Sequence, residues 1–176
     1  MSTLTQATTG PASILDRGGS APPVKKAQLV TAEEAIERAP AFAPLVALWR
    51  DRRGAEPAPC WRQMDFVDFR GWHSELVLSS FDGDAPDPRF RLVGETFAQL
   101  AGMPLKGMRF SEYSPQHFDR QLRDHFAKLR ETAKIGLVEG SGCREGQEHV
   151  SLQVLELPFR DGGTRIERLV HVVKPL

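Results

Sequence analysis

The C-terminal part of this chain limits most strongly what it can fold into. Three apolar segments with the character of strands, 135–139, 149–159 and 164–173, follow one another there and are separated by two turns that contain glycine. Short connections of this kind join antiparallel strands, because a parallel pair requires a crossover of about a dozen residues or more. The sequence therefore ends in a predicted three-stranded antiparallel meander.

A β-hairpin and a group of helices are expected before the meander. The segment 75–81 alternates like a strand, the turn formers of 82–88 interrupt it, and 90–93 supplies the returning strand. A short helix over 95–101 and a long helix over 115–134 then follow. Strands at both ends with helices between them predict an α+β fold, with a five-stranded antiparallel sheet and short helices on one face.

The N-terminal part divides into two regions. Residues 1–30 are rich in Ser, Thr, Gly, Pro and Ala and are predicted to be a disordered leader, because they offer little apolar surface to bury. Residues 31–54 are predicted to form helices, since Thr31 and Glu34 have the spacing of a capping box. The domain that contains the sheet is then expected over 55–176.

The second N-terminal helix carries an apolar stripe with helical spacing: Phe42, Leu45, Val46 and Trp49. Such a stripe has to be buried. It either covers the sheet of its own chain or pairs with its counterpart in a second subunit. The second possibility makes these four residues a candidate dimer or partner interface, and on this ground a homodimer is expected.

The composition excludes several classes of protein. The chain has 23 basic and 23 acidic side chains in 176 residues, so it lacks the basic excess with which nucleic-acid-binding proteins neutralise phosphates. No apolar stretch approaches the roughly 20 residues that a membrane-spanning helix needs, and no signal peptide is evident. Cys60 and Cys143 stand alone, as free thiols do in a reducing compartment. A cytoplasmic protein without nucleic acid or membrane partners is therefore expected.

Short phrases in the middle of the sequence carry a resemblance to a known family. They are Leu48-Trp49 with Arg53-Gly54, then Pro59, Arg62 and Asp65, the phrase Phe90-Arg91-Leu92-Val93-Gly94, and the glycines Gly102 and Gly107. In this order they resemble a subfamily of small stand-alone bacterial PAS domain proteins, except that the proline expected after Asp65 is missing. The resemblance covers about 44–173. It implies a five-stranded sheet that cups a small cavity, with a role in sensing or protein interaction.

The helices between the hairpin and the meander supply the residues that would line such a cavity. With about 100° per residue along the long helix, His125 falls near the centre of its apolar face, beside Leu122. The predicted cavity lining is Phe97, Leu100, Met103, Met108, Phe110, Tyr113, Leu122 and His125.

His125 and a few arginines are the polar candidates. Three roles are open for His125. It is a core histidine bonded to a backbone carbonyl, or it makes a polar contact to a small ligand, or, by resemblance to haem-binding PAS proteins, it is an axial haem ligand. No histidine pair has the spacing of metal ligands, so neither a metal nor another cofactor is expected. The spacings of Arg62 with Asp65 and of Arg50 with Arg53 leave nucleotide binding open.

The predicted function is that of a stand-alone PAS-type module in bacterial signal transduction. It would bind a small ligand in an apolar cavity, a signalling partner protein, or both, and would have no catalytic activity. The alternative is a small cone-shaped α+β enzyme of the isomerase or dehydratase type, with His125 or His171 as its base. Strand order separates the two, since a PAS sheet places its final strand beside its first and the long helix crosses its face.

Overall fold

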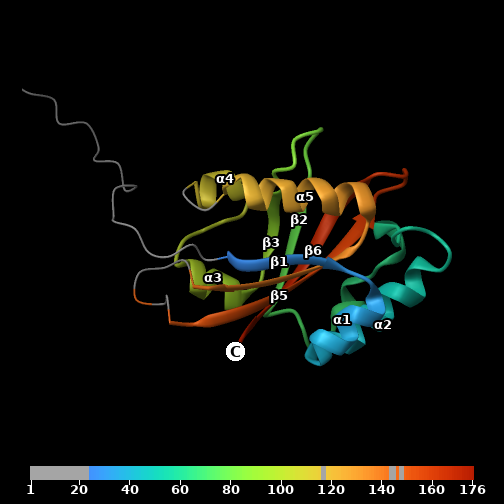
Figure 1. Ribbon diagram of the computed structural model, residues 1–176, viewed down its shortest axis with the longest axis horizontal. Helices are drawn as coiled ribbons and strands as arrows, with labels where there is room; N and C mark the ends of the chain where they lie inside the picture. Colours follow the sequence, from blue (N-terminus) through green and yellow to red (C-terminus); the bar gives the residue numbers. More distant parts are fainter. Residues whose placement is uncertain (1–23, 116–117, 143–145, 147–148) are drawn as a thin grey trace, which may run out of the picture.

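The computed structural model describes residues 24–115, 118–142, 146 and 149–176 (Figure 1). Its strands are β1 (Val24–Val30), β2 (Leu76–Ser80), β3 (Arg89–Val93), β4 (Ile135–Ser141), β5 (Ser151–Arg160) and β6 (Ile166–Pro175). Its α-helices are α1 (Ala32–Arg38), α2 (Ala43–Arg53), α3 (Glu95–Ala101), α4 (Phe110–Tyr113) and α5 (Arg120–Thr132), and its 3-10 helices are η1 (Pro40–Phe42), η2 (Trp61–Gln63) and η3 (Phe66–Phe69). None of the described helices has both the length and the hydropathy to cross a membrane.

The strands of the described residues form one antiparallel sheet in the order β1-β4-β5-β6-β2-β3. The predicted hairpin is β2 with β3 and the predicted meander is β4 to β6, so both predictions are confirmed. The final strand β6 pairs with β2, the first strand of the hairpin, and α5 crosses the sheet (Figure 1). This is the arrangement expected of a PAS sheet, and it argues against the cone-shaped enzyme.

The sheet has one strand more than the five expected. Val24–Val30 form β1, which pairs with β4, so the prediction of a disordered leader is wrong for these residues. The segment alone gives little sign of a strand, because Lys25 and Lys26 are exposed and the partner strand lies far away in the sequence. The rest of the predicted leader, residues 1–23, lies outside the described residues.

The long helix is shorter than expected. α5 spans Arg120–Thr132 rather than 115–134. At its start the Asp119 carboxylate accepts a hydrogen bond from the Leu122 amide at 3.1 Å, as an N-cap does. At its end Ala133 adopts a left-handed conformation with a φ of 53°, which stops the helix. The apolar pattern used for the prediction contains neither signal.

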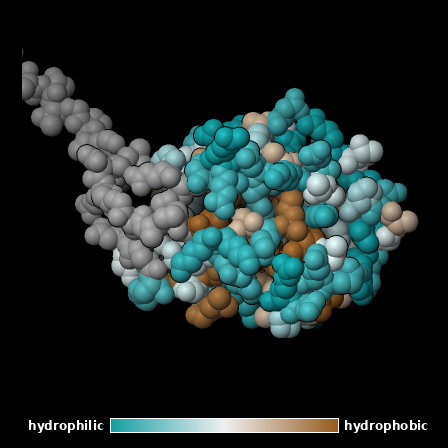
Figure 2. Space-filling view, in the orientation of Figure 1, coloured by the Kyte–Doolittle hydropathy of each residue, from teal (hydrophilic) through white to brown (hydrophobic). Residues whose placement is uncertain are grey.

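Helices cover both faces of the sheet. Because side chains alternate along a strand, Glu156 on β5 faces α5, whereas Leu155 and Leu157 face the opposite way. That second face is covered by the N-terminal helices, and the Trp49 indole of α2 donates a hydrogen bond to the Pro158 carbonyl of β5 at 2.8 Å. The face of the molecule seen in Figure 2 is mostly hydrophilic, and hydrophobic side chains show on it only in limited places.

The apolar stripe of α2 is buried within the chain. Its four residues, Phe42, Leu45, Val46 and Trp49, are no more than 3% exposed and belong to the same core cluster as Leu155 and Leu157. The stripe therefore covers the sheet. The prediction that these residues form a dimer or partner interface is wrong, because almost none of their surface is left for a second subunit. The capping box of Thr31 and Glu34 before the stripe is confirmed.

We expect Trp49→Phe to lower the free energy of unfolding by about 1–3 kcal/mol, because it keeps an aromatic ring but leaves the buried Pro158 carbonyl without its donor. Chemical denaturation of the full chain measures the loss. Trp72→Phe is the control, since the described residues show no hydrogen bond to this half-buried indole. Equal losses in the two variants would mean that ring size, and not the hydrogen bond, sets the effect.

Candidate functional site

A small apolar cavity lies between the sheet and the helices α3 to α5, with a volume of about 120 Å³. Its helix side is lined by Phe97, Phe110, Tyr113, Phe118, Leu122 and Phe126. Its sheet side includes Val24, Val77, Val138, Leu152, Val154 and Val173, together with Glu156 and His171. An apolar enclosure with few polar groups is the usual form of a small-molecule site. Val24 shows that the unexpected strand β1 helps to close the cavity.

The structure places four of the predicted lining residues in the cavity wall: Phe97, Phe110, Tyr113 and Leu122. Leu100 and Met108 do not line the cavity but pack behind its wall, against the cluster of Val77, Phe90, Leu105, Leu152 and Val173, and Met103 is 43% exposed. The spacing of apolar residues on short helices does not show which side chain points into the cavity. The sequence also provides no means of predicting which strand residues line it. Ligand binding by these four residues remains a prediction.

His125, the remaining predicted lining residue, is buried beside the cavity rather than in its wall. Its Nε2 lies 2.5 Å from Oε2 of Glu156 on β5. The partner is therefore a carboxylate of the sheet and not a backbone carbonyl. The site does not fit haem, because this nitrogen is already paired and even drug-sized ligands occupy pockets of about 300 Å³ or more. Within the described part of the chain, no group of three His, Cys, Asp or Glu side chains is arranged to hold a metal ion.

Glu156 is the centre of this site, and it was missed by the sequence analysis. It is only 3% exposed. Its Oε1 lies 3.3 Å from Nδ1 of His171 on β6, and Nε2 of His171 lies 2.7 Å from the hydroxyl of Ser79 on β2. Strand register places Glu156 opposite His171, so the two side chains share the face that α5 covers. A polar chain thus runs from α5 through β5 and β6 to β2.

Two features of the sequence could have pointed to Glu156. By strand alternation it shares the inward face of β5 with Leu152 and Val154, where a carboxylate is unexpected. Its neighbour in β4 is Gly136, and a Cβ there would come within 2.2 Å of Oε2 of Glu156. Only a glycine leaves the carboxylate room to reach His125.

The surroundings of Glu156 and His125 favour their charged forms. Burial by itself would raise the pKa of Glu156, but the positive charge and hydrogen bond of His125, together with the hydrogen bond of His171, lower it to about 2. Burial by itself would lower the pKa of His125, but the Glu156 carboxylate outweighs it and raises this pKa above its ordinary value. The two side chains therefore form a buried ion pair.

The order of groups in Ser79, His171 and Glu156 resembles that of a serine–histidine–acid triad. A nucleophile must reach its substrate, however, and Ser79 is 0% exposed and does not belong to the cavity wall. His171, one of the two bases considered for an enzyme, has both ring nitrogens engaged in this chain. The arrangement therefore holds strands and helix together and offers no accessible nucleophile.

Comparison with known proteins agrees with this architecture. The family described as PAS domain matches residues 38–172. No curated protein matches the chain at a significant level. Among solved structures, the chain is similar to an RNA-binding light-oxygen-voltage receptor, at 15% sequence identity and a TM-score of 0.48. That match covers 89% of this chain and 40% of the receptor chain, so this chain spans less than half the length of that protein.

The sign of the pH dependence follows from the two pKa shifts. The contribution of Glu156 is present above its ordinary value of 4.5 and is lost as the pH falls toward about 2. The contribution of His125 is complete below its ordinary value of 6.5 and is lost as the pH rises through its raised pKa. The pair therefore stabilises the fold most between these two ordinary values.

We expect Glu156→Gln to lower the free energy of unfolding by about 3 kcal/mol near pH 6, because it leaves buried His125 without its counter-charge. The difference from the wild type should shrink as the pH rises through the raised pKa of His125, because this ring then becomes neutral in the wild type as well. Urea denaturation at a series of pH values measures it. The control is Glu139→Gln, an exposed carboxylate on β4. A difference that stays constant with pH would contradict the ion pair.

Proposed function

This chain belongs to the PAS domain family, and we propose that it is a non-catalytic sensory module that binds a small, uncharged, largely apolar ligand. The observation that carries the proposal is the apolar cavity between the sheet and α5. Apolar cavities on the order of 150 Å³ accept ligands of the size of benzene, so the volume of about 120 Å³ suits a compact molecule of few heavy atoms.

The lining supports the choice of an uncharged ligand. Glu156 and His171 of the wall are already paired, since both oxygens of Glu156 meet histidines and both ring nitrogens of His171 meet protein partners. A charged ligand would have to break one of these contacts, at the cost of a buried unpaired group. The remaining wall is mostly aromatic and aliphatic, so it favours binding of a ligand that fits its shape and buries apolar surface.

The position of the cavity gives a route from ligand to output. An occupant would touch Leu122 and Phe126 on α5 and Val24 on β1 at the same time. Because α5 is also held to the sheet through His125 and Glu156, a ligand that moves Leu122 or Phe126 strains that ion pair. A signalling partner protein would then recognise the changed surface of α5 and β1. The expected homodimer stays a prediction, and its interface would have to lie outside the buried stripe of α2.

Fluorobenzene titrated into the full chain, followed by ¹⁹F NMR, tests the proposal together with native mass spectrometry of the protein as purified. The matched variants are Val173→Leu and Val172→Leu, adjacent residues of β6 that are both no more than 2% exposed. Val173 lines the cavity and Val172 faces the opposite layer. The added methylene should weaken fluorobenzene binding severalfold in the first variant and leave it unchanged in the second.

The same pair provides a stability test that does not depend on the probe. Val173→Leu should cost less stability than Val172→Leu, because it fills empty space, whereas overpacking a filled core costs about 1–3 kcal/mol. A protein that carries no bound mass and shows no saturable fluorobenzene signal would overturn the proposed ligand site. So would equal loss of binding in the two variants.

A further inference from the structure

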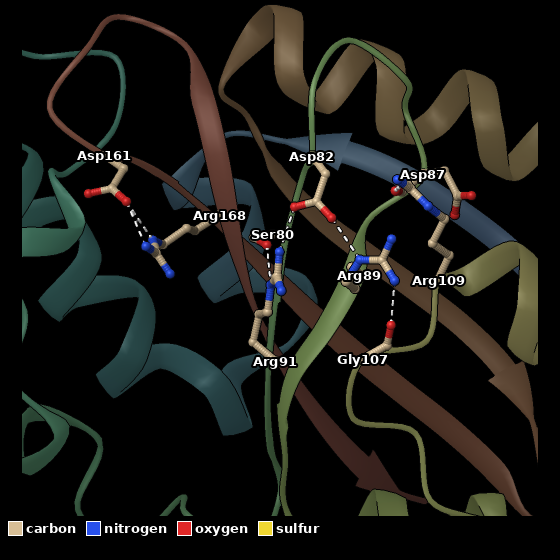
Figure 3. A network of polar contacts seen from close by, with 9 residues as sticks. All are labelled: Ser80, Asp82, Asp87, Arg89, Arg91, Gly107, Arg109, Asp161 and Arg168. Carbon is tan, nitrogen blue, oxygen red and sulfur yellow. Dashed lines mark hydrogen bonds and ion pairs between the residues drawn. The ribbon is translucent and has the colours of Figure 1, made fainter.

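Four arginines share two carboxylates on the face of the sheet opposite the cavity, at the edge where β2 ends and β3 and β6 begin. Figure 3 shows both carboxylates and three of these arginines, Arg89, Arg91 and Arg168. Asp82 accepts hydrogen bonds from Arg89 Nε at 2.7 Å and from Arg91 Nη2 at 2.5 Å. Asp161 accepts from Arg168 Nη2 at 2.6 Å, and its other oxygen lies 3.5 Å from Nε of Arg62. We call these four residues, Arg62, Arg89, Arg91 and Arg168, the arginine row.

Strand register brings the two halves of the arginine row together at Ser80. Ser80 on β2 stands opposite Arg168 on β6 and opposite Arg89 on β3. Side chains at such positions are neighbours on one face, with Cβ atoms about 5 Å apart. Arg91 Nε also donates to the Ser80 hydroxyl at 2.6 Å. In Figure 3, Arg168 lies on one side of Ser80, and Arg89 with Asp82 lies on the other.

The charges in this row do not balance. Hydrogen bonds from Arg89 and Arg168, respectively, lower the pKa of Asp82 and of Asp161, so both carboxylates are ionised at neutral pH. Each carboxylate is shared by two guanidinium groups, and each set of three therefore keeps one positive charge. Of the neighbouring charged residues, Arg109 adds one positive charge, and Asp87 and Glu112, which also act on Arg89, add one negative charge each. The surplus that remains is one positive charge, on the Asp161 side of the row.

The row also keeps unused donors that solvent can reach. Within the described residues, Nη1 of Arg91 and Nη1 of Arg168 have no acceptor. The side chains of Arg62, Arg91 and Arg168 are 75%, 43% and 29% exposed. Ser80 is only 9% exposed; its hydroxyl accepts from Arg91, which leaves its own proton to donate. The aspartates hold the guanidinium groups in place before any ligand arrives.

We propose that the arginine row with Ser80 is a binding site for a phosphate dianion, either free phosphate or the phosphate group of a small phosphomonoester. The surplus positive charge and the exposed guanidinium donors on both sides of Ser80 suit an anion such as a phosphomonoester, which carries a charge of about −1.5 to −2 near neutral pH. Planar guanidinium forks donate two parallel hydrogen bonds to phosphate oxygens, and a hydroxyl donor at the centre completes the set.

The test titrates inorganic phosphate and, separately, adenosine monophosphate into the full chain at constant ionic strength, followed by ¹H–¹⁵N correlation spectra that include arginine Nε. Saturable shifts are expected at Ser80, Arg91 and Arg168. Arg91→Gln and Arg168→Gln should each weaken phosphate binding about tenfold or more, as expected for a lost charged hydrogen bond. Arg165→Gln is the matched control, since Arg165 pairs with Asp84 at 2.6 Å outside the row.

The two probes distinguish the source of the phosphate. Equal affinities would identify free phosphate as the ligand, and tighter binding of adenosine monophosphate would identify a phosphomonoester. The proposal is overturned if neither probe gives saturable shifts, or if Arg165→Gln weakens binding as much as Arg91→Gln. Thermal unfolding of each variant verifies that it is folded. None of these results depends on whether the apolar cavity binds a ligand.

Discussion

The buried ion pair between His125 and Glu156 is the interaction on which the rest of this structure depends. A carboxylate and an imidazolium removed from water are stable only together, because either one alone carries a desolvation cost of several kcal/mol. The pair therefore fixes where α5 lies on the sheet. It also fixes the register of β5, since a slip of one residue would move Glu156 to the opposite face, among the apolar residues next to Leu155 and Leu157. Gly136 supplies the space that this geometry requires.

The same pair explains how a charged wall and an apolar cavity coexist. His125 and His171 use the hydrogen-bonding capacity of Glu156 on the protein side, so the space bounded by valines and phenylalanines is left for an apolar occupant. A ligand there sits against the helix that the ion pair holds. The proposed ligand and the attachment of α5 would therefore share one set of contacts, and this is the physical basis for the proposed sensing role. The arginine row lies on the other face of the sheet and is independent of the cavity and of the His125–Glu156 pair.

Local patterns in the sequence predicted most of the fold. The turn formers of 82–88 located the hairpin, the glycine turns located the meander, and the i, i+3, i+4 stripe that ends at Trp49 located a buried helix. β1 was not predicted, because the hydrogen bonds that make it a strand come from β4, far along the chain. The stripe showed that its residues are buried, but it could not show whether they pack against the sheet of their own chain or against a second subunit. A monomer core and a dimer interface impose the same apolar pattern.

The candidate site was predicted only in part for a similar reason. The apolar residues of the helix side have a composition typical of a cavity wall, and four of them lie there. Glu156 depends on two histidines from other elements, and the arginine row depends on residues from three separate segments, so neither has a local signature. The most direct test of the account is the ¹⁵N NMR shift of the His125 ring as a function of pH. The account predicts that both ring nitrogens are protonated above the ordinary pKa of 6.5, and that Glu156→Gln removes this protonation. A His125 ring that is already neutral at pH 6.5 in the wild-type protein would contradict it.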